Sequence, residues 1–293
     1  MVATVLSATS LPFETELLIL QRYQEDWKAK DRRLDGKAGT VARLRRWLPV
    51  LLLVIWATAS AGSTSLYFPS MATILQTLQQ DWLGPGFVEH LVPSVLKFLA
   101  GFLLAGVLGI GLGLVIGMFP LLRAATEPVI QFLRSLPPPV LLPIGLLVFG
   151  IGPSMNIAII VVGAIWPTLL NTIDGVRSLD PQLAEMSRSY KLTPGQRVRF
   201  VILPNAGPQI FAGLRTTLQM SIILIVVSEM VASTNGIGYY VLNSQQTFAV
   251  AETWAGTLIL GLLGYLANVL FTRLERYVLR WQSGLRASTG SAS

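Results

Sequence analysis

The chain has 293 residues, of which 52% are hydrophobic and only 13% are charged, and its mean hydropathy is +0.60. Soluble domains carry roughly twice that charged fraction, so the composition predicts an integral membrane protein. Cysteine is absent and histidine occurs once, which excludes disulfides, thiolate metal sites and multi-histidine metal clusters. The net charge of +7 does not indicate nucleic acid, because the basic residues lie between apolar segments.

The first 46 residues are polar, and residues 28–46 contain eight Lys and Arg side chains. We interpret 1–46 as a basic cytoplasmic N-terminal tail. The first apolar segment, 47–62, ends in Ala59-Ser60-Ala61, which is compatible with a signal-peptidase site. A polar leader of this length is much longer than the charged region of a signal peptide. We therefore favour a retained transmembrane helix over a cleaved one.

Residues 63–92 contain no Lys or Arg and are expected on the external side, where Ser70 would cap an amphipathic helix. The segment 140–149 follows three prolines that must break a helix. Because 140–149 is short for a span, we expect its helix to include residues upstream of those prolines. The five apolar segments after residue 92 are 93–118, 140–149, 155–170, 210–232 and 254–271.

Loops that contain Lys or Arg alternate with loops that lack them, and both ends of the chain are basic. The positive-inside rule therefore predicts that both termini are cytoplasmic, which requires an even number of spans. The predicted fold is all-α and polytopic, with six transmembrane helices. Lys97 and Arg215 lie near the ends of spans, where a long side chain can reach the interface. Residues 283–293 are expected to form a disordered tail.

Small residues recur at every fourth position of the segment 93–118. In lipid, such a stripe lets another helix approach closely. The partner helix can belong to the same chain or to a second subunit, and packing within the chain is at least as well supported. The stripe consists of Gly101, Ala105, Gly109, Gly113 and Gly117.

Polar side chains within the apolar segments are candidates for a solute pathway. Glu229 lies late in the segment 210–232, and an ionisable residue there indicates either a pathway or a bond between helices, with equal support. His90 is expected to be a solvated side chain near the outer surface, not a proton switch. The other pathway candidates, each of which can equally bond to a neighbouring helix, are Asn171, Gln219, Ser221 and Ser228.

The polar stretch 178–208 contains two helix-start signals. Asp180-Pro181 fits the N-cap and first position of one helix. Thr193-Pro194-Gly195-Gln196 fits the capping box of a second helix, which we expect to run to Pro204. The two short helices should meet at Lys191-Leu192. Such a rigid element suits docking into a groove of another protein, although amphipathic loops without a partner are common.

The same stretch resembles the EAA loop of permeases in binding-protein-dependent ABC importers. The resemblance rests on Glu185-Met186-Ser187, a basic helix, and then Val201-Ile202-Leu203-Pro204. Met186-Ser187 replaces the family's paired alanines, and Lys191 stands where the family has glycine, so a non-glycine residue must make the turn. Further stretches, similar to those of the nitrate, bicarbonate, taurine and alkanesulfonate branch, are Pro69-Ser70, 99–104, 149–152, 171–177, 213–215, 228–230 and 236–239.

The resemblance covers about residues 45–282 and implies the type I ABC importer permease fold, with a permease core at 93–282, in the bacterial inner membrane. It implies three protein partners: a cytoplasmic ABC ATPase dimer, an external solute-binding protein, and a second permease subunit, which we expect to be an identical chain. Membrane lipid surrounds the permease pair. Because the chain has no Gly-x-x-x-x-Gly-Lys-Ser/Thr, we expect no cofactor on it and no enzymatic activity of its own, with ATP and Mg on the ATPase. The implied solute is a small anion or zwitterion such as nitrate, bicarbonate, taurine or an alkanesulfonate. The implied contacts of the coupling loop are Glu185, Met186, Ser187, Arg188, Lys191, Thr193, Gln196, Arg197 and Pro204.

Two other functions were weighed. A self-contained six-span channel or secondary transporter would usually show inverted repeats and charged residues at the midplane, which the sequence lacks. An intramembrane hydrolase of the Ser/His or metal type would need a histidine within the catalytic layer, and His90 is expected outside it.

Overall fold

The computed structural model describes residues 47, 48, 50–63 and 65–280. The chain divides into two units, Met1–Thr64 and Ser65–Ser293. The described part of the first unit contains one short apolar helix, Val50–Ser60, within the predicted first span. The predicted tails 1–46 and 283–293 lie outside the described residues.

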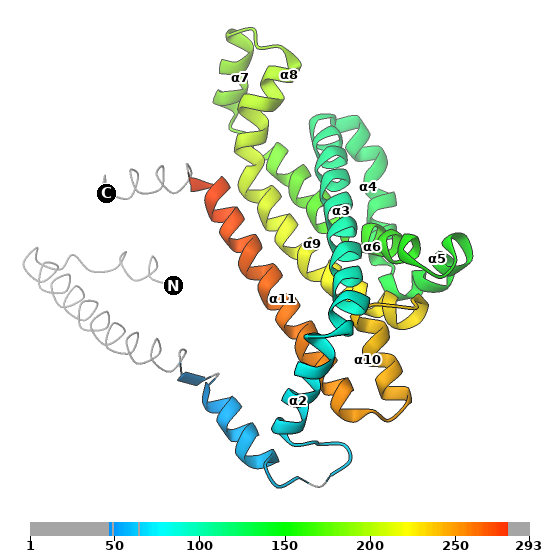
Figure 1. Ribbon diagram of the computed structural model, residues 1–293. Helices are drawn as coiled ribbons and strands as arrows, with labels where there is room; N and C mark the ends of the chain where they lie inside the picture. Colours follow the sequence, from blue (N-terminus) through cyan, green and yellow to red (C-terminus); the bar gives the residue numbers. More distant parts are fainter. Residues whose placement is uncertain (1–46, 49, 64, 281–293) are drawn as a thin grey trace, which may run out of the picture. The chain divides into compact units, whose positions relative to one another are not determined.

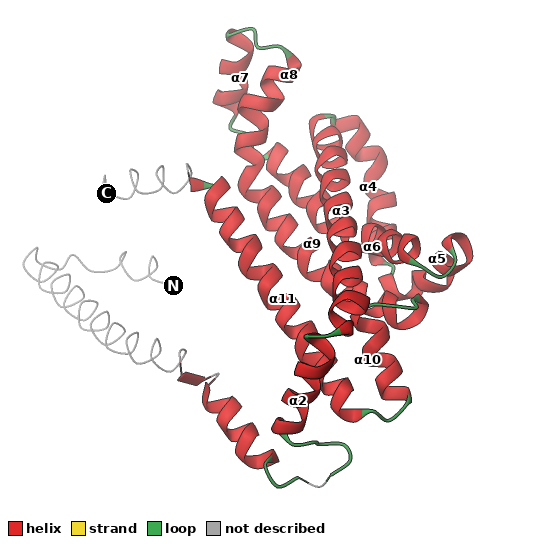
Figure 2. Cartoon of the chain, viewed as in Figure 1, coloured by secondary structure: helices red, strands yellow, loops and turns green. Residues whose placement is uncertain are grey.

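Every regular element in the described part of the second unit is a helix, as Figures 1 and 2 show. The predicted all-α fold is therefore confirmed. In chain order the elements are α2 Met71–Trp82, η1 Phe87–Leu91, α3 Val92–Met118, α4 Pro120–Ser135, η2 Pro138–Leu141, α5 Leu142–Phe149, α6 Pro153–Arg177, α7 Pro181–Ser189, α8 Pro194–Arg197, η3 Val198–Ile202, α9 Leu203–Ala232, α10 Ile237–Gln246 and α11 Val250–Val278.

Within the described residues, four continuous helical stretches are long and apolar enough to cross a membrane. A fifth span results if α4 and η2–α5, which meet at a bend of 89° at the prolines, are counted together as one span. The apolar helix Val50–Ser60 is shorter than these stretches and is not counted among them. The four stretches, which include the short π turns before or within them, are Phe87–Met118, Pro153–Arg177, Pro194–Ala232 and Val250–Val278. Length and composition thus identify four or five of the six predicted spans.

The region around the three prolines corrects one expectation. The segment before them is a separate amphipathic helix, α4, and not an upstream extension of the helix over 140–149. α4 ends at Ser135, and Leu136 takes an extended conformation with ψ of 123°. Proline lacks an N–H and disfavours helical geometry in the residue before it, so one helix cannot run through Pro137-Pro138-Pro139.

The stripe of small residues on α3 packs against α6 of the same chain. Ala105 is completely buried, and a Cβ atom placed at Gly113 would lie 2.6 Å from the Cβ atom of Thr172. Added Cβ atoms on the other three glycines would meet Ile160, Thr168 and Val176, one after another along α6. The stripe therefore lets two spanning helices approach closely, and α9 packs against both to complete the centre of the unit.

α2 and α10 lie at the end of the second unit opposite α7 and α8 (Figure 1). The predicted cap of α2 is confirmed, since the Ser70 side chain accepts a hydrogen bond of 3.2 Å from the Thr73 N–H. α10 was not predicted, because its ten residues lie in an uncharged stretch that reads as a loop. Trp82 of α2 packs with Ile237 of α10 in a buried apolar cluster.

Candidate functional site

Residues 180–202 form a projecting turn between α6 and α9, which we call the elbow (Figure 1). Its first helix, α7, begins as predicted: the Asp180 side chain accepts a hydrogen bond of 2.8 Å from the Gln182 N–H, and Pro181 is the first helical residue. The cap satisfies one of the free N–H groups at the helix start. This short helix is therefore defined by its own local sequence.

Lys191 makes the turn between α7 and α8. Its φ of 52° lies in the left-handed region, where a side chain is unfavourable. The N–H of Lys191 donates to Arg188 O at 2.9 Å, and the N–H of Leu192 donates to Ser187 O at 3.2 Å, so the turn closes the end of α7. The expectation that a non-glycine residue makes this turn is confirmed.

The second helix begins with the predicted capping box. The Gln196 side chain accepts from the Thr193 N–H at 2.9 Å, and the Thr193 hydroxyl accepts from the Gln196 N–H at 3.4 Å. The predicted end of this helix at Pro204 is wrong. The helix continues from Pro194 through the π turn Val198–Ile202 into α9, and it ends only at Ala232. Proline is tolerated at the point where the helix widens into a π turn, because the usual hydrogen-bond pattern is already altered there.

α7 and its C-cap residue Tyr190 expose apolar side chains that a monomeric surface helix would usually bury. Leu183 is 43% exposed, Met186 is 55% exposed and Tyr190 is 74% exposed, and Glu185 is also exposed. Ser187, by contrast, is buried, and its hydroxyl donates to Ala184 O at 2.6 Å. Such a capped helix with exposed Met and Tyr side chains is suited to insertion into a groove on another protein.

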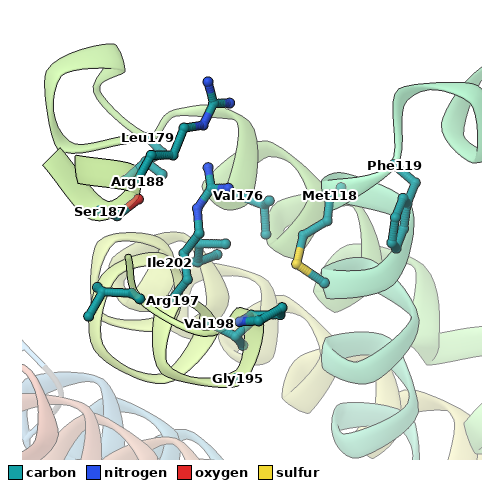
Figure 3. Close-up of a pocket in the computed structure, with 13 residues that line it drawn as sticks. Met118, Phe119, Val176, Leu179, Ser187, Arg188, Gly195, Arg197, Val198 and Ile202 are labelled. Atoms are coloured by element: carbon teal, nitrogen blue, oxygen red, sulfur yellow. The ribbon is translucent and has the colours of Figure 1, made fainter. Parts of the chain in front are cut away.

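The inner side of the elbow borders a cavity of about 600 Å³. The cavity separates the elbow from the end of α3 at Met118-Phe119 and the end of α6 at Val176 (Figure 3). Arg188 and Arg197 both line it. Three of the predicted contacts of the coupling loop, Ser187, Arg188 and Arg197, thus lie at the cavity, while Glu185 and Met186 are not among its lining residues.

The five predicted pathway residues do not converge on this cavity. Ser221 and Ser228 are buried and donate to carbonyl groups of their own helix, at 2.7 Å and 3.1 Å. Asn171 donates to Pro167 O at 2.8 Å, and Gln219 is exposed. Glu229 is bound to other helices. Bonding to a neighbouring helix, the alternative stated for these residues, therefore describes Glu229, whereas Asn171, Ser221 and Ser228 bond within their own helices.

The carboxylate of Glu229 lies at the centre of a buried polar network. It accepts hydrogen bonds from Ser94 at 2.8 Å and from the Gly238 N–H at 3.0 Å, and Lys97 Nζ lies 2.6 Å from its Oε1 atom. Gly236 has a φ of 116°, and a side chain there would collide with this carboxylate. The network therefore joins α3, α9 and the first turn of α10, and it requires glycine at position 236.

The position of Lys97 corrects one expectation. Its side chain does not extend to the interface but is buried, with Asn235 O and Ser233 Oγ as further partners at 3.2 Å and 3.3 Å. The ammonium group is paired with the carboxylate of Glu229 at 2.6 Å. A lysine inside an apolar span is itself a signal that a partner carboxylate is near, and that signal could have identified the pair.

His90 is half-buried and not freely solvated. Its Nδ1 atom accepts a hydrogen bond of 3.3 Å from the Gly236 N–H, and its ring contacts Tyr239 and Tyr240. Among the described residues, no three His, Cys, Asp or Glu side chains are grouped so that they could hold a metal ion.

Comparison with known proteins identifies the family of the chain. Residues 106–283 match the family model of the binding-protein-dependent transport system inner membrane component. The chain belongs to this family. It is 30% identical over 239 residues to the bicarbonate transport system permease protein of Synechococcus elongatus, with 78% of this chain and 86% of the relative covered.

Other relatives agree with this assignment. The permease is 28% identical to the taurine transport system permease protein of Escherichia coli, with 80% and 87% of the two chains covered. Its fold resembles a chain of the inward-facing MetNI methionine ABC transporter at a TM-score of 0.53 and 26% identity, covering 64% of this permease and 95% of that chain. The predicted type I importer fold and the role as an ABC importer permease of the inner membrane are therefore confirmed.

Proposed function

We propose that the elbow couples this permease to a separate ATPase subunit. The main support for this role is the continuous helix Pro194–Ala232, which begins in the elbow and runs into the buried centre of the protein. A force on α7 and the turn at Lys191 is passed directly to α9, which packs against α3 and α6. The exposed Leu183, Met186 and Tyr190 supply an apolar docking surface, and Glu185 supplies a polar contact beside it.

In this proposal the energy comes from ATP and Mg on a cytoplasmic ABC ATPase dimer. Binding and hydrolysis of ATP move the docked elbow, and the spans then alternate between inward-facing and outward-facing arrangements. This is a two-state element whose equilibrium is biased by a ligand at a distant site. A second permease subunit, an identical chain, completes the solute pathway, and an external binding protein delivers the solute.

The proposed solute is a small anion or zwitterion. The support comes from relatives whose names specify bicarbonate and taurine. Purification of the permease with its associated external binding protein, followed by calorimetric titration of that binding protein with nitrate, bicarbonate, taurine and an alkanesulfonate, tests this class. Binding of only a neutral sugar or a cationic amino acid would contradict it.

The coupling role is tested by replacing Glu185 with Lys in the complex reconstituted into liposomes. We expect solute uptake to fall at least about tenfold while ATP hydrolysis continues, because one lost charged contact of about 1.5–3 kcal/mol weakens docking by that factor or more. Glu127→Lys is the matched control, since Glu127 is also exposed but lies on α4, away from the elbow. If Glu185→Lys left solute uptake unchanged, the docking role proposed for Glu185 would be contradicted.

The proposed orientation places the elbow and both termini in the cytoplasm. The natural protein has no cysteine, so single cysteines can be introduced without removing others. We expect Ser189→Cys to react with an impermeant maleimide only from the cytoplasmic side, and Gln245→Cys only from the external side. Both positions are exposed, at opposite ends of the second unit. Labelling of Ser189→Cys from the external side would contradict this orientation and indicate the opposite topology.

A further inference from the structure

The cavity between the elbow and the ends of α3 and α6 has the composition of an anion site. Arg188 and Arg197 are two of the thirteen described residues that line it, and none of the thirteen is acidic. Within the described residues, neither arginine takes part in an ion pair. Two positive charges that share one cavity repel each other unless an anion lies between them.

Arg197 adds a second, independent indication. Its Nε atom is buried and has no hydrogen-bond partner among the described residues. A buried donor on a charged group is rarely left unpaired, because its lost hydration must be replaced. The Arg197 side chain reaches into the cavity from the second helix of the elbow, and Arg188 extends in the same general direction from α7 (Figure 3).

The remaining walls of the cavity are mostly apolar. Met118 and Phe119 close it from the end of α3, Val176 and Leu179 border it on the α6 side, and Ile202 belongs to the π turn before α9. Apolar walls strengthen the attraction between a guanidinium group and an anion, since they exclude water. They also provide a surface for a hydrocarbon chain.

We propose that this cavity binds an oxyanion, with its phosphate-type or sulfonate-type group on Arg188 and Arg197 and any attached hydrocarbon chain against Met118, Phe119 and Val176. Two sources share this chemistry: the headgroup of an anionic phospholipid from the surrounding membrane, and a free small oxyanion in the cytoplasm. Guanidinium groups suit both, because they bind such oxyanions in a bidentate manner. The bound group would join the elbow to the transmembrane helices.

The lipid source is tested by native mass spectrometry of the purified full-length chain in detergent with equal amounts of phosphatidylglycerol and phosphatidylcholine. We expect the natural protein to retain phosphatidylglycerol preferentially. Arg197→Gln and, separately, Arg188→Gln should each weaken that retention at least about tenfold, the effect of one lost charge-assisted contact. Arg188 is exposed, so its variant removes a charge without disturbing a packed side chain.

Arg199→Gln is the matched control. Arg199 lies two residues from Arg197, is exposed, and contacts the ring of Phe200 at 5.5 Å instead of lining the cavity. Its variant should retain phosphatidylglycerol like the natural protein. Equal losses in Arg199→Gln and Arg197→Gln would reveal only general attraction to an anionic surface and would overturn the proposal.

The free-anion source is tested by the thermal unfolding midpoint in inorganic phosphate and in hexanesulfonate. A rise of the midpoint in the natural protein that is absent from Arg197→Gln supports a soluble oxyanion, whereas a response to phosphatidylglycerol alone supports the lipid. If neither kind of ligand distinguishes the natural protein from Arg197→Gln, the cavity is not an anion site. This binding test requires no ATPase and no transport, so its failure leaves the coupling role of the elbow unaffected.

Discussion

Lys97 Nζ and Glu229 Oε1 lie 2.6 Å apart, and their side chains are only 4% and 1% exposed. One residue belongs to the first half of α3 and the other to the end of α9, so the pair joins two spanning helices. Buried charges are costly unless they are paired and hydrogen-bonded, and here Ser94 and Gly238 supply further bonds to the carboxylate. The ion pair therefore connects α3 and α9 at the end of the protein that carries α10.

Breaking this pair should strongly destabilise the protein. We expect Lys97→Met to cost about 3–5 kcal/mol, because it leaves the carboxylate of Glu229 buried without its counter-charge. The double variant Lys97→Met with Glu229→Gln should recover part of the loss, since no buried charge remains. The measurement is the unfolding midpoint in detergent.

The pair of Arg215 and Glu275 provides the control for that prediction. Arg215 is 44% exposed, so this contact is much less enclosed by protein than the Lys97–Glu229 pair. Arg215→Met should therefore cost only about 0–1 kcal/mol. An equal loss in Arg215→Met and Lys97→Met would show that burial does not decide the strength of these two pairs.

Two glycines of α3, two residues apart, should respond in opposite ways to alanine. At Gly113 an added Cβ atom would lie 2.8 Å from the backbone oxygen of Leu169, which cannot move away easily. Gly113→Ala should therefore cost about 1–3 kcal/mol by overpacking. At Gly111 an added Cβ atom meets nothing within 4 Å, so Gly111→Ala should stabilise the helix by up to about 1 kcal/mol. Unfolding midpoints of the two variants, which should move in opposite directions, check this.

Glycine at position 191 should stiffen the elbow. Lys191 holds φ at 52°, which costs a side-chain residue roughly 1–2 kcal/mol compared with glycine. Lys191→Gly should slow amide hydrogen exchange at Tyr190 and Leu192, whose N–H groups are bonded within the turn. Lys191→Val should accelerate exchange at the same amides, because a β-branched residue tolerates this conformation least. Identical exchange in the two variants would contradict the strain assigned to the turn.

Ionisation of Tyr240 should lower the stability of the protein at high pH. Burial, and then the hydrogen bond of 2.5 Å to Asp81, raise the pKa of the Tyr240 phenol well above its ordinary value of 10.0. A raised folded-state pKa means that this stabilisation is fully present below pH ~10 and is lost as the pH rises above that value. Because the side chain is partly exposed, we expect a loss of at most about 1 kcal/mol between pH 9 and pH 11.

Two phenylalanine variants isolate that effect. Tyr240→Phe should flatten the decline of the unfolding midpoint between pH 9 and pH 11. Tyr265→Phe should leave the decline as in the natural protein, since Tyr265 is 66% exposed and lies on α11, away from Asp81. The assignment to Tyr240 would be wrong if both variants flattened the curve equally.

Local signals in the sequence were sufficient to predict where the two helices of the elbow begin. The caps at Asp180 and Thr193 depend on hydrogen bonds between residues two or three positions apart. They can therefore form independently of the tertiary structure. The end of the second helix at Pro204 was predicted wrongly for a related reason. Proline was read as a stop signal, whereas the π turn Val198–Ile202 lets the helix pass it.

What the sequence determined by itself is the membrane class, the all-helical fold, the helix starts of the elbow and the family resemblance. The membrane class, the fold and the helix starts follow from hydropathy and short-range capping. The resemblance rests on short motifs such as Glu185-Met186-Ser187 and Val201-Ile202-Leu203-Pro204. All of these features are local to the chain. Only the tertiary structure decided that Lys97 pairs with Glu229, that the small residues of α3 face α6, and that Arg188 and Arg197 share one cavity. Those contacts join residues far apart in sequence, and their free energy depends on distance, burial and the loss of water, which no local pattern contains.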